Sequence, residues 1–213
     1  MSLRSGAAHG YRAAMARPLR TFVALELPSS LAYELHDRAE ELAEHDPALA
    51  VPAAEHLHLT LAFLGDTWIE DVHRIAKALQ RAAAGTPAIP VACPGLGAFP
   101  DAARARVVHA PVVDLSEADV LAGLHERIGV ELEELGFPRE RRRWQPHVTL
   151  ARLRGRPAEA TVEAVRAAAS EPTDQGPEAI LSLLALISSD PAAREYRYKN
   201  LTTIHLGDEG KDG

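Results

Sequence analysis

The chain has 213 residues, of which 46% are hydrophobic, and carries a formal net charge of −7 at neutral pH. This length suits one domain or two closely joined lobes with a real core, and the acidic balance argues against a protein that coats nucleic acid through bulk electrostatics. No apolar stretch reaches the ~18 residues that span a bilayer, and Cys93 has no second cysteine to pair with, so we expect a cytoplasmic protein that contacts no membrane.

The first 18 residues lack the continuous apolar segment of a signal peptide and are interpreted as a disordered leader or an appended tail. Residues 19–208 are expected to form a single bilobal domain, because no low-complexity linker divides them. Its two pseudo-repeats are expected at 19–112 and 113–208. Residues 209–213 are expected to be a C-terminal tail.

The first half of this domain alternates between the apolar periodicity of strands and that of helices. A helix is predicted to begin with Ser29 or Ser30 as its N-terminal cap, and a second helix to run from about Trp68 to Gly85. The strands of this half are predicted at 21–27, 56–64, 88–99 and 104–110.

The second half repeats the order helix, strand, helix and two strands. The predicted elements are a helix at 116–135, a strand at 147–153, a helix at 157–170, and strands at 179–188 and 195–206. We therefore predict an α+β, bilobal, duplicated fold in which two mainly antiparallel sheets flank a central cleft, with the helices on the outside.

The same pattern, His-x-Thr-Leu, occurs at His58 and, 89 residues later, at His147. Successive side chains of a strand point to opposite faces, so each histidine shares a face with the threonine two residues on, Thr60 or Thr149. Two imidazoles and two hydroxyls can hold a phosphate and move protons around it. Because both patterns occupy the same position in their halves, we expect them to face each other across a pseudo-twofold cleft.

A basic segment surrounds the second pattern. Residues 139–156 hold seven arginines and a single acid, Glu140. This segment is either a solvated charged loop or a region that attracts phosphate. Strict alternation places Arg152 on the face opposite His147, so Arg152 reaches a phosphate only if the strand twists, bulges or ends there.

A metal centre is the first alternative to weigh. His56 and His58 form a His-x-His pair on one predicted strand face, but no nearby Asp, Glu or Cys completes a ligand set. We therefore expect no metal and no cofactor, and His56 is interpreted as a neighbour at the rim of the cleft.

Other aromatic and histidine residues have weaker patterns. Phe63 is expected in the core with the leucines of its strand, with base stacking as the alternative. Trp144 and Tyr196 can stack on a nucleobase or serve the structure. His109 and His125 have no partner residues at a spacing typical of a catalytic or metal site, so we expect ordinary surface or core roles for them.

These motifs resemble the 2H phosphoesterase superfamily, and within it the RNA 2′,3′-cyclic phosphodiesterases, also called 2′-5′ RNA ligases. The resemblance runs from Arg20 onward and is carried by HLHLTLAFLGD, GLGAFPDAARARVVHAPV and GFPRERRRWQPHVTLARLR. It implies that His58 is the general acid, or proton donor, and that His147 is the general base, or proton acceptor. Thr60 and Thr149 also match the two motifs and are the candidate substrate-binding residues, and Arg152 is a candidate for an added phosphate contact. One departure is His109, where the resemblance leads us to expect an aromatic residue.

The resemblance also implies a reaction. RNA ends that carry a 2′,3′-cyclic phosphate are hydrolysed to 2′-phosphate ends without a metal, and 2′-5′ ligation is the reverse direction. The expected partners are RNA ends or nucleotides with this cyclic group, and the expected oligomeric state is a monomer. The alternatives are a cyclic phosphodiesterase acting on small nucleotides, a module that binds RNA ends or nucleotides without turnover, and a metal protein built on His56 and His58.

Overall fold

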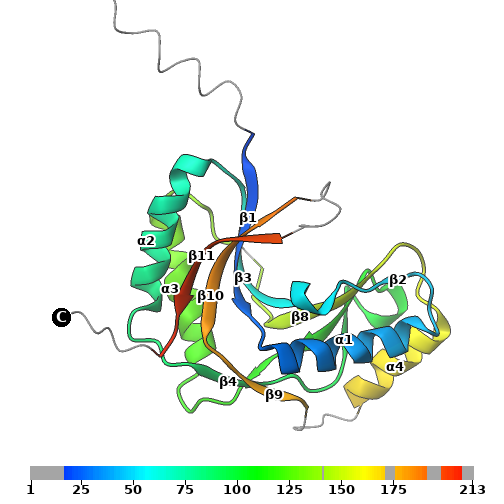
Figure 1. The fold of residues 1–213 in the computed structure, drawn as a ribbon. Helices are drawn as coiled ribbons and strands as arrows, with labels where there is room; N and C mark the ends of the chain where they lie inside the picture. The colour runs from blue at the N-terminus through cyan, green and yellow to red at the C-terminus, as the bar shows by residue number, and fades with distance from the viewer. Residues whose placement is uncertain (1–16, 141, 171–175, 191–197, 208–213) are drawn as a thin grey trace, which may run out of the picture.

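A computed structural model describes residues 17–207, apart from 141, 171–175 and 191–197. The predicted tail, and all but the last two residues of the predicted leader, lie outside these residues. The described part has four α-helices and two antiparallel sheets, which confirms the predicted α+β class (Figure 1). None of its helices combines the length and the apolar character that crossing a membrane requires.

The elements follow one another along the chain with short connections. The strands are β1 (Leu19–Glu26), β2 (Leu49–Ala50), β3 (His58–Thr67), β4 (Ile89–Ala92), β5 (Gly97–Phe99), β6 (Val107–Pro111), β7 (Val113–Asp114), β8 (His147–Leu153), β9 (Glu178–Leu181), β10 (Leu183–Ser189) and β11 (Tyr198–His205). The helices are α1 (Ser29–Ala43), α2 (Val72–Ala83), α3 (Val120–Glu134) and α4 (Glu159–Ser170). Short 3₁₀ turns are η1 (Ala54–His56), η2 (Ile69–Asp71) and η3 (Ala102–Arg104).

The larger sheet has the strand order β11-β10-β1-β3-β8-β6-β5, with β2 added beside β8. The two His-x-Thr strands, β3 and β8, are antiparallel neighbours that pair at Leu59 and Val148. The expectation that they face each other from separate sheets is therefore wrong. In Figure 1, β1, β10 and β11 rise on one side of this junction, while β8 and β2 extend to the other side.

The strands of the two sequence halves are interleaved. β10 and β11, from the second half, extend the sheet beyond β1, whereas β5 and β6, from the first half, continue it beyond β8. The smaller sheet has the order β7-β4-β9, so the corresponding strands β4 and β9 pair with each other. Each lobe of the larger sheet therefore contains strands from both predicted repeats.

Two of the predicted strands are each divided between the sheets. The segment predicted as one strand at 88–99 forms β4 in the smaller sheet and β5 in the larger one. Between them Gly95 has a φ of +67°, a conformation that glycine adopts readily and that breaks a strand. The segment predicted at 179–188 divides at Ser182 into β9 and β10 in the same way.

The predicted helix starts also shift. Neither Ser29 nor Ser30 caps α1, because the residue before the helix is Pro28 and no side chain caps the first turn. Helix α3 begins at Val120 rather than at 116, because the Asp114 carboxylate accepts hydrogen bonds from the backbone N–H groups of Ser116 and Leu121. These bonds hold the intervening residues in a turn.

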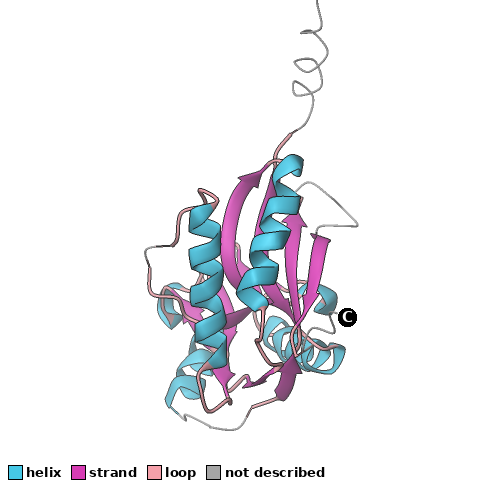
Figure 2. Ribbon diagram, turned by 90° about the vertical axis from the view of Figure 1, so that its left-hand side faces the viewer, coloured by secondary structure: helices cyan, strands magenta, loops and turns pink. Residues whose placement is uncertain are grey.

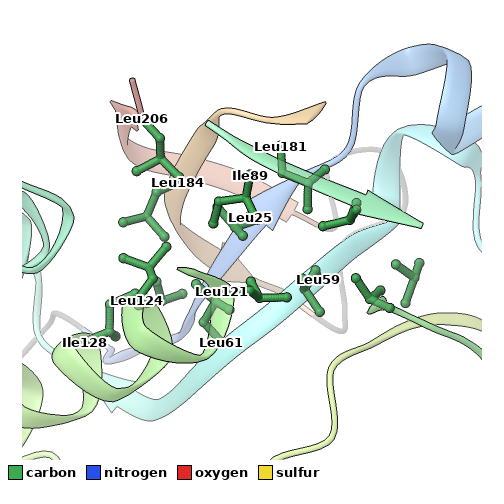
Figure 3. Packing of buried hydrophobic residues seen from close by; sticks show 14 of the residues in the cluster. Leu25, Leu59, Leu61, Ile89, Leu121, Leu124, Ile128, Leu181, Leu184 and Leu206 are labelled. Carbon is green, nitrogen blue, oxygen red and sulfur yellow. The ribbon is translucent and has the colours of Figure 1, made fainter. Parts of the chain in front are cut away.

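Helices cover the sheet in two pairs, and the pair α2 and α3 is seen in Figure 2 lying against the strands. The largest buried cluster lies between these helices and the sheet (Figure 3). Leu59 and Leu61 of β3 point into it together with Leu124 and Ile128 of α3. Each such side chain contributes roughly 1.5–3 kcal/mol through burial. This burial fixes which face of β3 is left for His58.

Asp46 joins the other two helices. It is 1% exposed and lies in the turn after α1. Its carboxylate accepts hydrogen bonds from the backbone N–H of Ala158 at 2.8 Å and from the hydroxyl of Thr161 at 2.6 Å, both at the start of α4. Burial by itself raises the pKa of Asp46, but these bonds and one from Ala48 outweigh it and lower the pKa.

Replacing this carboxylate tests whether Asp46 holds α1 and α4 together. Asp46→Ala leaves several donors at the start of α4 unpaired, so we expect the free energy of unfolding to fall by about 2 kcal/mol. The loss is present above the unfolded pKa of ~3.9 and shrinks as the pH falls below it, because the native pKa is the lower one. Urea unfolding at several pH values measures it. Asp37→Ala, at an exposed position of α1, is the control and should change stability by less than about 0.5 kcal/mol.

Candidate active site

The pairing of β3 with β8 brings the two His-x-Thr patterns to one face of the sheet. Residues directly opposite each other in a sheet point to the same side. Since Leu59 and Val148 are paired and both point into the core, the histidines and threonines that flank them share the other side. We call this side the site face. The antiparallel register sets His58 on the Thr149 side and Thr60 on the His147 side.

Both strands bulge at the same point. In β3, Thr60 pairs with Ala24, and Ala62 pairs with the residue just before Ala24 in β1. Leu61 is therefore an extra residue without a partner in this register. In β8, Thr149 and Ala151 pair with consecutive residues of β6, so Leu150 is the extra residue. An extra residue shifts the alternation of side chains by one position. The residue five positions after each histidine therefore returns to the site face.

Those residues are Phe63 and Arg152. Phe63 is 68% exposed and pairs with Phe22, whose ring stacks on His58. The expectation that Phe63 lies in the core is therefore wrong. Arg152 is exposed although it follows two buried residues of β8, and its charge acts on His58. Arg152 was expected to reach the site only if its strand twists, bulges or ends, and the bulge in β8 meets this condition.

The two imidazoles are held by the same local hydrogen bond. Nδ1 of His58 donates to the carbonyl oxygen of His56 at 2.8 Å, and Nδ1 of His147 donates to that of Gln145 at 2.7 Å. A carbonyl oxygen can only accept, so the Nδ1 atoms carry the protons. In the neutral form of either ring, Nε2 then carries the lone pair. Each Nε2 can take a proton or, once protonated, give one.

Aromatic rings surround His58. Phe22 stacks on it with 4.7 Å between ring centroids, and Tyr198 meets it edge-on at 5.5 Å. Burial lowers the pKa of His58 to about 4, and the positive charges of Arg152 and His147 add to the effect of burial. The hydrogen bond to the His56 carbonyl opposes this shift only in part. His58 is therefore neutral at neutral pH while the site holds no anion.

Aromatic rings surround His147 as well. Phe99 of β5 lies edge-on at 4.9 Å and His109 of β6 at 5.1 Å. His109 pairs with Thr149 in the sheet and is 8% exposed, so it lies directly beside the second His-x-Thr pattern. Burial and the charge of His147 lower the pKa of His109 to about 4. Nothing in the sequence indicated that the hairpin places His109 directly beside β8, and the expected ordinary role of His109 stays a prediction.

The segment that leads into β8 is tied to both neighbours. The Trp144 indole N–H donates to the carbonyl oxygen of Thr60 at 3.3 Å, and its ring stacks on His125 of α3 at 4.1 Å. Arg139 pairs with Glu126 and Glu133, also of α3. These contacts give Trp144 a structural position. The glutamates of α3 therefore neutralise part of the basic segment. Tyr196, the other predicted stacking residue, lies outside the described residues.

The His-x-His pair of the metal alternative lies within the part of the chain that the structure describes. There, no group of three or more His, Cys, Asp or Glu side chains could hold a metal ion. His56 belongs to η1 rather than to β3, and its ring lies edge-on against Tyr198. The two histidines of the His-x-His pair therefore do not share a strand face.

A longer sequence repeat would have indicated the bulges. The pattern His-x-Thr-Leu-Ala-x-Leu covers 58–64 and 147–153, three residues more than the four that alternate cleanly. The repeated Leu-Ala pair marks the position where alternation fails in both strands. No such signal existed for His109, because its position beside Thr149 depends on the register between β6 and β8.

Paired His-x-Thr strands at the centre of an antiparallel sheet are the arrangement of a 2H phosphoesterase. The chain belongs to the 2′-5′ RNA ligase superfamily, whose family model matches residues 27–190. It is 29% identical over 136 residues to the RNA 2′,3′-cyclic phosphodiesterase of Thermotoga maritima, a match that covers 64% of this chain and 71% of that protein. It is 27% identical over 137 residues to the protein of the same name from Methanothermobacter thermautotrophicus, with 64% and 72% covered.

Solved structures share the fold. The protein TT0787 of Thermus thermophilus has a TM-score of 0.69 at 23% identity, with 90% of this chain and 100% of that chain covered. LigT of E. coli complexed with 3′-AMP has a TM-score of 0.65 at 24% identity, with 89% and 98% covered. The fold is therefore that of LigT and TT0787.

The depressed pKa of His58 can be measured directly. Titration by ¹H–¹⁵N NMR of the free protein should place it near 4, and inorganic phosphate should raise it, because a bound anion favours the charged ring. Since the unfolded chain binds more protons between pH 6.5 and about 4, the free energy of unfolding should fall as the pH is lowered through this window. A free-protein pKa at or above 6.5 would contradict the burial described here.

Proposed function

We propose that this protein hydrolyses RNA ends that carry a 2′,3′-cyclic phosphate, giving 2′-phosphate ends, by metal-independent general acid–base catalysis. The observation that supports this best is the matched pair of imidazoles on β3 and β8, each with Nδ1 engaged and Nε2 free. Two such nitrogens on one sheet face suit a reaction that needs a base and an acid at one phosphorus. The names of the curated relatives point to the same reaction.

In the proposed step, water attacks phosphorus while Nε2 of His147 takes its proton. Protonated His58 gives the Nε2 proton to the departing 3′-oxygen, and the phosphate stays on the 2′-oxygen. The resemblance of the motifs supplies this order of roles. His58 is neutral in the free protein, so the proposal requires the bound anionic substrate to raise the pKa of His58 and the ring to take up a proton from solvent before it acts as the acid.

The remaining groups on the site face stabilise the phosphate. The hydroxyls of Thr60 and Thr149 donate hydrogen bonds to the non-bridging oxygens, where negative charge grows in the transition state. Arg152 adds a cation on the same face, because the bulge at Leu150 turns it there. A guanidinium offers several donors in a fixed fork that suits phosphate.

Phe63 and Arg152 make the two half-sites unequal. They occupy corresponding positions of β3 and β8, one an exposed aromatic ring and the other a cation. An exposed ring on this face can stack on a nucleobase, a contact worth about 1–3 kcal/mol. We therefore place the terminal base on the Phe63 side and the RNA phosphate backbone on the Arg152 side.

Ligation of a 2′,3′-cyclic end uses the same chemistry with a hydroxyl in place of water, and it is the reverse of cleaving a 2′-5′ linkage. A 5′-hydroxyl takes the position of the water, His147 accepts its proton, and the 3′-oxygen leaves as before. The product is a 2′-5′ linkage, and no further residue is needed.

The two histidines are tested by single substitutions. An oligonucleotide with a 2′,3′-cyclic phosphate end is incubated with the protein and EDTA, and 2′-phosphate ends are quantified. His58→Ala and His147→Ala should each lower kcat by roughly 10²–10⁴-fold, while His73→Ala, at an exposed position of α2, should match the wild type. Full activity in either site variant would refute the assignment, and tight binding without turnover by the wild type would favour a binding module. The ratio of kcat/KM for a cyclic mononucleotide and for the oligonucleotide separates small-nucleotide from RNA substrates.

Arg152 is tested against a matched arginine. Arg152→Leu should lower kcat/KM by about 10- to 100-fold, the effect of losing a charge-assisted hydrogen bond. Arg154→Leu removes the same charge from an exposed position two residues further on and should have a much smaller effect. Equal losses in both variants would show that only bulk charge matters.

A further inference from the structure

His109 is a third imidazole on the site face. Its strand neighbour on one side is Thr149, and its neighbour on the other side is Gly97 of β5. The ring stacks on Phe99 with 4.1 Å between centroids and lies 5.1 Å from the ring of His147. His109 therefore lies between the second His-x-Thr pattern and the edge of the sheet.

The backbone beneath His109 is shaped to receive its ring. A Cβ atom at residue 97 would lie 2.4 Å from Cε1 and 2.7 Å from Nε2 of His109. These distances are far below van der Waals contact, so any side chain at Gly97 would displace the ring. Gly97 thus permits the close approach that holds His109 flat against β5 and edge-on to His147.

The two ring nitrogens of His109 have different surroundings. Nδ1 is buried and has no partner at hydrogen-bond geometry among the described residues, and the backbone of Ala110 opposes the lowering of the His109 pKa only in part. Buried N–H groups are rarely left without an acceptor, so the lone pair belongs on Nδ1 and the proton on Nε2. Because Nδ1 is enclosed, a ligand that binds this ring has to do so at Nε2. This tautomer is the opposite of the one that the backbone carbonyls impose on His58 and His147.

We propose that His109 is a third histidine of the reaction site, a neutral imidazole whose Nε2–H donates a hydrogen bond to an oxygen of the phosphate held between His58 and His147. This inference rests on the proposed function. Among the described residues, His147 is the group whose charge acts on His109, and Arg152 of β8 lies further along the same face, paired with Val107. A neutral donor at this position binds the phosphate without placing a positive charge beside His147, where such a charge would weaken that ring as a base.

Two substitutions separate donation from packing. His109→Phe keeps the stack on Phe99 but has no donor, so kcat/KM should fall by about 10- to 100-fold. His109→Gln replaces the ring with an amide that can donate from near the Nε2 position, so it should recover much of this loss. If the ring of His109 only packs against His147, the order of kcat/KM is reversed: His109→Phe should stay active and His109→Gln should be impaired. Wild-type activity in His109→Phe, or a less active His109→Gln, would overturn the proposal.

The size of the loss should also be independent of pH across the neutral range, because a neutral donor does not exchange its proton in the reaction. A loss that changes with pH would instead make His109 an acid or a base and would contradict the proposal.

A measurement without turnover separates this inference from the proposed function. In ¹⁵N-labelled protein, the ring nitrogen shifts of His109 should show the proton on Nε2, and inorganic phosphate should perturb that N–H. A proton on Nδ1, or an Nε2–H unaffected by phosphate at saturation of the site, refutes the inference. If the wild type fails to hydrolyse the cyclic end, the proposed function fails, while the tautomer and the phosphate response still decide the role of His109.

Discussion

The pairing of Leu59 with Val148 is the constraint on which the site depends. It makes β3 and β8 neighbours in one sheet and turns both residues into the core. The histidines and threonines on either side then have to share the opposite face. The dense core beneath, with α3 packed against β3, holds this register, because a slip of one residue would exchange the two faces of a strand.

Local backbone geometry prepares these side chains for chemistry. The bond from Nδ1 to the carbonyl two residues earlier fixes the tautomer of His58 and of His147 in the same way. The bulges at Leu61 and Leu150 then bring Phe63 and Arg152 to the site face. Each half-site is therefore built from one short segment of chain, and the sheet only has to bring the two segments together.

The duplication is closely matched in backbone and unequal in side chains. Aromatic rings enclose both imidazoles, but the second ring beside His58 belongs to Tyr198 and the second ring beside His147 belongs to His109. Phe63 and Arg152 occupy corresponding positions of β3 and β8, yet one is an aromatic ring and the other a cation. A symmetric site would bind a nucleotide in two equivalent orientations, so under the proposed function these differences would favour one orientation.

The sequence by itself determined the α+β class, the strand positions of both His-x-Thr patterns and the pairing of each histidine with a threonine, because these follow from local periodicity. It misplaced Phe63 and left Arg152 conditional, since a bulge breaks the alternation on which such predictions depend. Only the tertiary structure decided that β3 and β8 are neighbours, that the halves exchange strands, and that His109 lies beside Thr149. These features arise from pairing between residues distant in the chain, where register is set by the packing of the whole core rather than by the local sequence.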